Sequence, residues 1–491
     1  MKKSKDLDQY RFRLEKLEKL KEKKINAFPA QAERTHTIKQ ALAKFEKLAK
    51  NNKEVTILGR LKSLRLHGGS LFCDLEDASD SIQIYLKKNK LGPEKYNLFK
   101  NNFDIGDFIQ ITGLLFKTKR GEETVLVHDY KLLTKALMPL PEKWHGLSDT
   151  EVRFRQRYLD LIANPEVKAI FEKRSLIVRA IREFLDRRGF LEVETPVLQS
   201  IPGGANAKPF KTHHKALDID LYLRIAPELF LKRLIIGGFE KVYEIARCFR
   251  NEGIDHSHNP EFTQVEFYWA YADYEDLMQL TEQMIGHILD SLKIGPKIKY
   301  ENRTIDFKAP FKRISFNQAL KKYVAIDLDK IKNDKELIKK AKNKGLEIEK
   351  NEQRGSIIDN LFKKLIRPNL INPTFVIDYP TEISPLSKKK ATQPNYTERF
   401  QLIAGGQELT NAFSELNDPL DQKERFMAQE SLRKKGDQEA QRIDESFIEA
   451  LTYGMPPTAG FGLGIDRLTA LLTNRHNIKE VILFPTLKPK K

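Results

Sequence analysis

Residues 54–134 are dominated by alternating apolar and polar positions. The two-residue period of a half-buried β-strand runs through "EVTILGRLKSLRL", "SLFCDLEDA", "SIQIYLKK", "DFIQITGLLFKTK" and "ETVLVHDYKLLT". Glycine- and aspartate-containing turns separate these runs, among them Gly68-Gly69 and Gly121. Five short strands in one segment predict a small β-barrel domain over residues 54–134.

The first 53 residues have a helical period instead. Apolar side chains recur every three or four residues at Leu7, Tyr10, Leu14 and Leu17, and Pro29 ends the pattern. Lysines and arginines fill the positions between them. We expect residues 1–53 to form a basic helical arm that either docks on nucleic acid or packs on the body of the protein with a solvated face.

The rest of the chain has mixed patterns. Residues 135–165 contain Pro139 and Pro141 and predict a linker. From residue 166 to 491 we expect one large α+β domain. It begins with a long amphipathic helix, "PEVKAIFEKRSLIVRAIREFLDRRG", followed by a strand in "FLEVETPVL". Residues 290–375 are lysine-rich and predict a mostly helical insertion, after which strands resume.

Composition narrows the class of protein. The chain has 491 residues, of which 40% are hydrophobic and 31% charged, which fits a globular protein of several domains. No apolar run approaches the roughly 20 residues that cross a bilayer, and the N-terminus lacks the apolar core of a signal peptide. We therefore expect a cytoplasmic protein without a membrane partner. Cys73 and Cys248 are the only cysteines, which excludes a disulfide framework and a cysteine zinc site.

Net charge points to a polyanionic partner. Lysine and arginine number 86 and aspartate and glutamate 68, so the formal charge is +18. Such a surplus favours binding to a nucleic acid, although solvated lysine-rich faces would give the same total. An OB-fold is the commonest small barrel that binds single strands, and Arg65, Phe72, Gln83 and Glu122 offer a stacking ring and polar groups for bases.

A predicted hairpin at 241–270 carries side chains suited to a nucleotide. "KVYEIARCFRNEG" predicts a strand that runs into a loop, and "EFTQVEFYWAY" predicts the returning strand. The hairpin contains a cation, a carboxylate, an imidazole and a flat ring, at Arg250, Glu252, His258 and Phe262. A guanidinium binds phosphate and an aromatic ring stacks on a base. Glu266 and Tyr268 alternate onto the same face as Phe262.

A glycine-rich strand follows near the C-terminus, in "TAGFGLGIDRLTALLT". A dinucleotide fingerprint requires glycine at position 465, which is isoleucine. Alternate glycines at 460, 462 and 464 instead leave one face of a strand without side chains, so that a ligand approaches the backbone. Arg467 begins the next helix within reach of a phosphate. In "SIPGGANAKPF", Gly203 and Gly204 predict a second close backbone approach.

The segment "ERFQLIAGGQELTNAFSELNDP" groups several carboxylates in a basic chain. It predicts two strands, 399–404 and 407–414, joined at Gly405-Gly406. Asn411, Phe413 and Glu415 alternate onto one face, whereas Glu408 has the opposite parity. All four converge only if a bulge lies between them.

These stretches together resemble the class II lysyl-tRNA synthetases of the bacterial type over nearly the whole chain. The segments that carry the resemblance are "FRNEG", "HNPEFT", "GFGLGIDR", "GFLEVETPVL", "IPGGANAKPF", "RIAPEL", "SPLSK" and "NAFSELNDP". It implies a class II catalytic domain with a seven-stranded antiparallel sheet, an N-terminal OB-fold that binds the anticodon, and a homodimer with Pro196 at its interface. The implied reaction attaches L-lysine to tRNA(Lys) with ATP, through a lysyl-adenylate.

The resemblance also implies roles for single positions. Arg250 and Arg467 match the catalytic arginines at the α- and γ-phosphates. The ATP contacts correspond to Arg250, Glu252, His258, Phe262, Glu408 and Arg467. The lysine pocket corresponds to Gly204, Glu228, Glu266, Tyr268, Asn411, Phe413 and Glu415, with Glu415 and Tyr268 nearest the ε-ammonium. Anticodon reading corresponds to Arg65, Phe72, Gln83 and Glu122.

One position departs from the family pattern. The family has two metal-binding carboxylates, which correspond to Glu408 and to position 401, where this chain has Gln401. An amide oxygen binds Mg²⁺ less strongly than a carboxylate does, because it lacks the negative charge. We expect Mg²⁺ as cofactor, about one to three ions per subunit, and ATP, L-lysine and tRNA(Lys) but not DNA as partners.

Three other functions remain as alternatives. An aspartyl- or asparaginyl-tRNA synthetase shares the architecture, but an acidic substrate would require a basic pocket instead of Glu266 and Glu415. A ligase that lysylates a protein would lack the barrel. A nucleic-acid-binding relative without catalytic activity would not need Arg250, Glu408 and Arg467.

Overall fold

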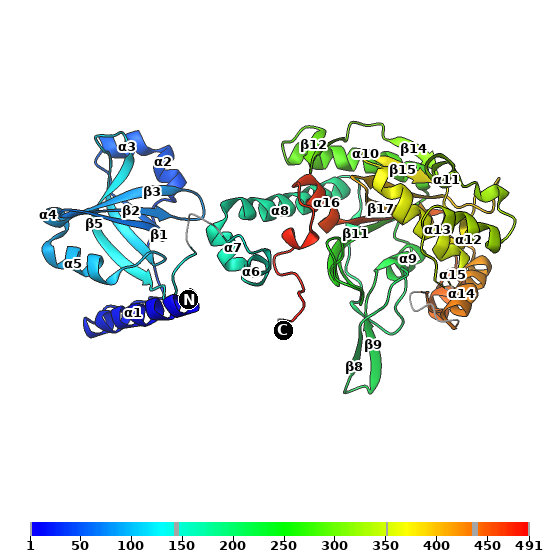
Figure 1. Ribbon diagram of the computed structural model, residues 1–491, viewed down its shortest axis with the longest axis horizontal. Helices are drawn as coiled ribbons and strands as arrows, with labels where there is room; N and C mark the ends of the chain where they lie inside the picture. The colour runs from blue at the N-terminus through cyan, green and yellow to red at the C-terminus, as the bar shows by residue number, and fades with distance from the viewer. Residues whose placement is uncertain (1, 142–146, 350–351, 435–439, 490–491) are drawn as a thin grey trace. The chain divides into compact units, whose positions relative to one another are not determined.

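The chain folds into two compact units, Met1–Ser148 and Asp149–Lys491. The structure is a computed structural model that describes residues 2–141, 147–349, 352–434 and 440–489 (Figure 1). No helix among these residues combines the length and the apolarity needed to cross a membrane.

The first unit is a closed five-stranded barrel with the strand order β1-β2-β3-β5-β4. Its strands are β1 (Val55–His67), β2 (Ser70–Glu76), β3 (Ser81–Lys87), β4 (Phe108–Lys117) and β5 (Glu123–Thr134). Its helices are α1 (Lys2–Glu22), α2 (Ile38–Ala43), α3 (Phe45–Lys50), α4 (Lys88–Leu91) and α5 (Pro93–Asn102). Alternate residues of β2 and β3 are buried, as the two-residue period predicts.

The N-terminal helices pack on the barrel. Leu17, Leu20 and Phe45 share one hydrophobic core with the barrel interior. Arg13 is also buried, and its Nη1 donates hydrogen bonds to the carbonyl oxygens of Ala136 and Met138, each at 3.0 Å. We expected residues 1–53 either to dock on nucleic acid or to pack on the body of the protein. The structure shows them packed on the barrel.

The second unit is built on an eight-stranded sheet with the order β14-β15-β16-β17-β18-β11-β10-β6. These strands are β14 (Lys312–Ser315), β15 (Thr374–Ile377), β16 (Arg399–Ala404), β17 (Gln407–Ser414), β18 (Thr458–Gly464), β11 (Glu261–Ala270), β10 (Lys241–Phe249) and β6 (Leu191–Glu192). The strands from β15 to β10 pair antiparallel, whereas the outer strands β14 and β6 pair parallel with their neighbours. The sheet thus has eight strands where the resemblance implied seven.

Two smaller sheets complete the strands of this unit: β7 (Leu198–Gln199), β9 (Ile219–Leu223) and β8 (Lys211–His214) in one, and β12 (Lys297–Tyr300) with β13 (Arg303–Asp306) in the other. The β8–β9 hairpin projects from the rest of the unit (Figure 1).

Helices cover both faces of the large sheet (Figure 1). One face packs on α8 (Pro165–Asp186), α10 (Tyr274–Ser291) and α16 (Ile465–Leu472). The other packs on α9 (Glu228–Ile236), α14 (Pro419–Lys434) and α15 (Glu445–Thr452). The remaining helices are α6 (Thr150–Arg155), α7 (Arg157–Ala163), α11 (Phe316–Val324), α12 (Asp334–Asn343) and α13 (Arg354–Leu361), with short turns η1 (Leu328–Lys330), η2 (Phe362–Ile366), η3 (Arg367–Asn369), η4 (Thr381–Ile383) and η5 (Ile478–Glu480).

Three segments differ in detail from the sequence prediction. The predicted linker 135–165 is divided, because its second half forms α6 and α7 within the second unit. The predicted strand in "FLEVETPVL" contributes only the two-residue β6 and the first residue of β7. The predicted helical insertion 290–375 also contains strands, β12 to β15.

Candidate functional site

Several of the predicted site residues lie on three neighbouring strands in the middle of the large sheet. Strand β18 lies between β11 and β17, and its glycines are paired on both sides. Gly462 lies opposite Glu266 on β11 and Asn411 on β17. Gly460 lies opposite Tyr268 and Phe413 in the same way. A strip without side chains is therefore bordered by two rows of functional groups.

Gly460 is the position at which this strip must be glycine. A Cβ added there would collide with Glu415 Oε1 and lie 2.6 Å from Cε1 of Tyr268. At Gly462 the same atom would lie 3.7 Å from its nearest neighbours, which is ordinary contact. The glycine at 460 thus makes room for the carboxylate of Glu415 and the ring of Tyr268 directly above the strand.

Three buried carboxylates, which we call the acidic pocket, lie over this strip: Glu228, Glu266 and Glu415. Glu228 begins α9, Glu266 is on β11, and Glu415 follows β17. Only 6%, 7% and 1% of these residues, respectively, are exposed to solvent. Groups so thoroughly removed from water require positively charged or hydrogen-bonding partners.

One partner of the acidic pocket is a lysine of the chain itself. Lys232, one turn after Glu228 on α9, is fully buried. Its Nζ lies 2.5 Å from Glu228 Oε1 and 2.5 Å from Glu415 Oε2. The other oxygen of Glu415, Oε1, has no hydrogen-bond partner among the residues that the structure describes. The pocket therefore has an acceptor free for a further cation.

Burial sets the protonation of this pocket. It raises the pKa of Glu415 well above the ordinary value; Lys232 opposes the shift and Glu228 adds to it. Burial and the charge of Glu228 likewise raise the pKa of Glu266. Burial alone would lower the pKa of Lys232, but Glu228 and Glu415 outweigh it and raise that pKa, so Lys232 stays charged. Burial therefore favours the protonated forms of Glu415 and Glu266.

The groups predicted to bind phosphate are not part of the acidic pocket. Arg250 directly follows β10, and its guanidinium lies 4.9 Å from the centre of the Phe262 ring. Nε of Arg250 is buried without a hydrogen-bond partner in the described part of the chain. Arg467, on α16, donates to the carbonyl oxygen of Glu408 at 3.2 Å and contacts His258 Nε2 at 3.4 Å. Glu252 lies half-buried in the loop after Arg250.

The remaining lysine-pocket positions also lie close by. Gly204 has a φ of +86°, and a Cβ there would lie 2.8 Å from that of Glu228. The loop thus approaches the start of α9 as only glycine allows. Asn411 Oδ1 accepts a hydrogen bond from Arg399 Nε at 2.9 Å, and Phe413 packs in the core beside α9.

The predicted bulge is present. Leu402 pairs with Thr410 and Ile403 with Glu408, so Leu409 is the extra residue on β17. The bulge reverses the parity between Glu408 and Asn411, which brings Glu408 to the side of the sheet that Arg467 contacts.

Comparison with known proteins agrees with this geometry. Residues 149–488 match the family model for tRNA synthetases class II (D, K and N), and residues 55–133 match that for an OB-fold nucleic acid binding domain. A lysine–tRNA ligase of Pelotomaculum thermopropionicum is 53% identical over 482 residues, which is 98% of this chain and 95% of the relative. One from Thermoanaerobacter pseudethanolicus is 55% identical over 438 residues, 89% of this chain and 88% of the relative. The chain belongs to the class II lysine–tRNA ligase family.

Membership in this family confirms the predicted fold class and the predicted enzyme, an AMP-forming aminoacyl-tRNA ligase. It does not favour the alternatives of an aspartyl or asparaginyl enzyme, a protein-lysylating ligase or a relative without catalytic activity.

The barrel of this ligase presents three of the four predicted anticodon positions on adjacent strands and the fourth in a turn. Arg65 on β1 lies opposite Phe72 on β2 and forms an ion pair of 3.0 Å with Asp74. Gln83 on β3 accepts a hydrogen bond from Thr124 Oγ1 at 3.1 Å. Glu122 is exposed in the turn that precedes β5.

Two further rings extend this face of the barrel. Tyr85 stacks on Phe72 with ring centres 4.6 Å apart, and Phe116 lies 6.0 Å from Tyr85. All three rings are half-buried on the outside of the barrel. The alternation in residues 81–87 and 108–117 indicates this row of rings, because Tyr85 and Phe116 fall at the polar, outward-facing positions of their strands.

Metal binding is the weakest match to the family pattern. Gln401 is buried, and its Oε1 accepts a hydrogen bond from the hydroxyl of Tyr379 at 2.8 Å. Burial raises the pKa of Glu408, but Arg467, Arg367 and Lys363 outweigh it and hold that pKa below its usual value. No group of three or more histidine, cysteine, aspartate or glutamate side chains in the described residues has a metal-binding arrangement. The amide oxygen of Gln401 is thus already bonded within the protein, and Glu408 lies among positively charged side chains.

Lys232, the cation within the acidic pocket, is not among the predicted site residues. The signal was present: a lysine four residues after Glu228, at a position of "ELFLKRLII" that lies among the buried apolar residues of the helix. A charge on the buried face of a helix requires a buried partner, and the i, i+4 spacing indicates which one.

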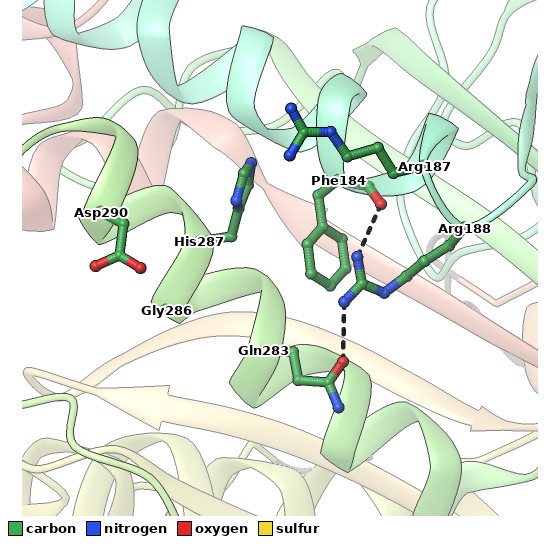
Figure 2. Close-up of a pocket in the computed structure, with 7 residues that line it drawn as sticks. All are labelled: Phe184, Arg187, Arg188, Gln283, Gly286, His287 and Asp290. Carbon is green, nitrogen blue, oxygen red and sulfur yellow. Dashed lines mark hydrogen bonds between the residues drawn. The ribbon is translucent and has the colours of Figure 1, made fainter.

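A hollow elsewhere in the second unit holds none of the predicted site residues. It has a volume of about 430 Å³ and lies between α8 and α10 (Figure 2). Arg188 crosses it, stacks 3.6 Å from the centre of the Phe184 ring and donates to Gln283 Oε1 at 3.0 Å. These contacts give the residues that line the cavity a structural role.

Proposed function

We propose that this chain activates L-lysine with ATP and then transfers it to tRNA(Lys), using the central strip of the sheet as its active site. The observation that carries the proposal is the acidic pocket above Gly460, in which Glu415 Oε1 has no partner in the described residues. A buried carboxylate with a free acceptor fits an ammonium group. Tyr268 lies beside it and supplies a hydroxyl.

The two ends of lysine bind at different parts of the strip. Glu415 and Tyr268 hold the ε-ammonium, while Glu228 and the Gly204 loop hold the α-ammonium. Asn411 and Arg250 face the carboxylate, Phe413 forms a wall of the pocket, and Glu266 adds negative charge. An amino acid without the ε-ammonium leaves Glu415 buried and unpaired, so it is rejected strongly.

The first chemical step joins the lysine carboxylate to the α-phosphorus of ATP and expels pyrophosphate. The carboxylate is already ionised near pH 7, so this step requires no general base. Arg250 stabilises the charge that develops at the α-phosphate, and Arg467 binds the γ-phosphate end. Phe262 stacks on adenine, and Glu252 and His258 contact the nucleotide. A terminal ribose hydroxyl of tRNA then attacks the adenylate and releases AMP.

Magnesium is the cofactor of this reaction, since the family depends on ATP and Mg²⁺. When bound, it neutralises phosphate charge. Glu408 is the carboxylate that holds it on the protein side, and we place the count at the low end of one to three ions. The basic residues near Glu408, including Arg467 and Arg367, already supply positive charge there.

The other partners follow from the same proposal. The face of the barrel that carries Arg65, Phe72, Gln83 and Glu122 binds the anticodon of tRNA(Lys), and the protein acts in the cytoplasm. A homodimer is supported by exposed apolar side chains beside Pro196: Leu191, Val197 and Leu198 are 50%, 39% and 47% exposed.

Amino-acid-dependent exchange of pyrophosphate into ATP tests the first step, and charging of purified tRNA tests the second. The proposal predicts exchange with lysine and not with aspartate, asparagine or norleucine. Exchange that follows another amino acid would overturn it. Lysine exchange without tRNA charging would limit it to the first step.

A further inference from the structure

Lys232 matches none of the predicted binding positions, yet its ammonium lies within the acidic pocket. It is fully buried and contacts one oxygen each of Glu228 and Glu415 at 2.5 Å. The rings of Phe413 and Phe447 lie 5.5 and 5.9 Å from Nζ. A lysine held in this way is a fixed part of the pocket. If its ammonium moved away from the two carboxylates, it would lie unpaired among apolar side chains.

The charges of the pocket can be counted. Glu228, Glu266 and Glu415 contribute three negative charges, and Lys232 contributes one positive charge. The nearby Glu244 is paired with Arg224 at 2.5 Å, and its remaining effect on the pocket is to raise the pKa of Glu266. When all three carboxylates are ionised, two negative charges remain, which equals the number of ammonium groups in L-lysine. The substrate carboxylate is then left for Arg250.

We infer that Lys232 is a specificity-determining residue that positions Glu228 and Glu415 and sets the charge of the pocket to match a substrate with two ammonium groups. This inference rests on the proposed lysine activation. Lys232 occupies one oxygen of each carboxylate and so directs the other, as with Glu415 Oε1, to the substrate.

The charged and titratable groups that act on this cluster come from several elements. They are Glu228 on α9, Glu266 and Tyr268 on β11, Glu415 after β17, and Arg399 on β16. Arg250 after β10 and Glu244 on β10 also act on Glu266. Removal of the Lys232 charge leaves three buried carboxylates with less compensation, and they bind protons more tightly. The substrate must then displace those protons, so lysine binds more weakly at neutral pH and recovers at higher pH.

The test is Lys232→Met, which keeps the length of the side chain and removes its charge. In lysine-dependent pyrophosphate exchange, we expect the KM for lysine to rise at least about tenfold, since hydrogen bonds to charged groups are lost. The KM for ATP stays within about twofold, because the nucleotide site is untouched. The pH profile of the lysine KM moves to higher pH. If Lys232 instead competed with the substrate, the KM for lysine would fall; a lower or unchanged value overturns the inference.

A matched control exists in the barrel. Lys135 is also fully buried and contacts two carboxylates, Asp104 at 2.5 Å and Asp107 at 2.8 Å. Lys135→Met is expected to lower the melting temperature without changing the lysine KM in exchange; an equal rise there would overturn the assignment to Lys232.

Two further measurements separate the role of Lys232 from a folding defect and from a failure of the proposed function. If Lys232→Met does not fold, Lys232→Arg retains the charge, and its lysine KM is expected to keep the pH profile of the wild type; a displaced profile overturns the inference. Wild-type protein without lysine-dependent exchange would overturn the proposed function itself, whereas normal wild-type exchange with an unaffected Lys232→Met variant would overturn only the role of Lys232.

Discussion

The hydroxyl of Tyr379 donates a hydrogen bond to Gln401 Oε1 at 2.8 Å. Both residues are buried, so the amide oxygen that would bind a cation is already used within the protein. Gln401 stands where the family pattern has a metal-binding carboxylate, and its side chain is held instead by the hydrogen bond from Tyr379.

Gln401→Glu tests what this departure does to metal use. The added carboxylate is expected to lower the Mg²⁺ concentration at half-maximal exchange, because a charged oxygen binds Mg²⁺ more strongly than an amide oxygen. Tyr379→Phe removes the hydroxyl without adding charge and serves as the matched control, with little change expected. Identical magnesium titrations for wild type and Gln401→Glu would show that position 401 is not near the metal.

Gly460→Ala is expected to abolish most lysine activation. The new methyl group would occupy the space of Glu415 Oε1 and Tyr268 Cε1 and displace both from the pocket. Gly462→Ala is the matched control, since its Cβ would find neighbours only at 3.7 Å and should cost far less activity. The KM for lysine and the exchange rate of both variants decide the matter, and equal effects would contradict the proposed position of the ε-ammonium.

The KM for lysine is expected to fall as pH rises, as long as both ammonium groups of the substrate stay protonated. The direction follows from the raised pKa values of Glu415 and Glu266: at lower pH these groups hold protons, which a substrate ammonium must displace. At higher pH they are ionised and bind the ammonium directly. Steady-state exchange at several pH values measures this, with the KM for ATP as internal control. A lysine KM that rises with pH would contradict the account.

Phe72→Ala is expected to weaken tRNA charging and leave lysine-dependent exchange intact. A stacked base contributes about 1–3 kcal/mol, so kcat/KM for tRNA should fall roughly tenfold or more. Tyr85→Ala tests the extended row of rings in the same assay, because Tyr85 supports Phe72 at 4.6 Å. Loss of exchange activity in either variant would indicate general damage, and unchanged charging would exclude an anticodon role for this face.

The sequence predicted the strands around the site better than it predicted how those strands pair. The alternation in 399–415 located both strands and required the bulge at Leu409, because parity is a property of a single strand. The pairing of Glu266, Gly462 and Asn411 across three strands could not be predicted from spacing, since it depends on sheet register. The parallel pairing of β6 and β14 is likewise a tertiary property.

Charge partners also required the structure. The fully buried Lys232 lies among apolar residues of α9, and only the fold shows that Glu415, 183 positions later in the chain, contacts it. Asp418, by contrast, has a local partner: its Oδ1 accepts a hydrogen bond from the amide of Leu420, two residues later, at 2.9 Å.

Lysine-dependent pyrophosphate exchange by Glu415→Gln tests the central claim most directly. Glutamine keeps the shape of the side chain and removes the charge that pairs with the ε-ammonium. We expect kcat/KM for lysine to fall at least about 100-fold, because the buried ion pair with the substrate is lost, while the KM for ATP stays nearly constant. Asp418→Asn, a change of the same kind three residues later, should leave both unchanged. Lysine exchange that survives Glu415→Gln at the wild-type level would contradict the account.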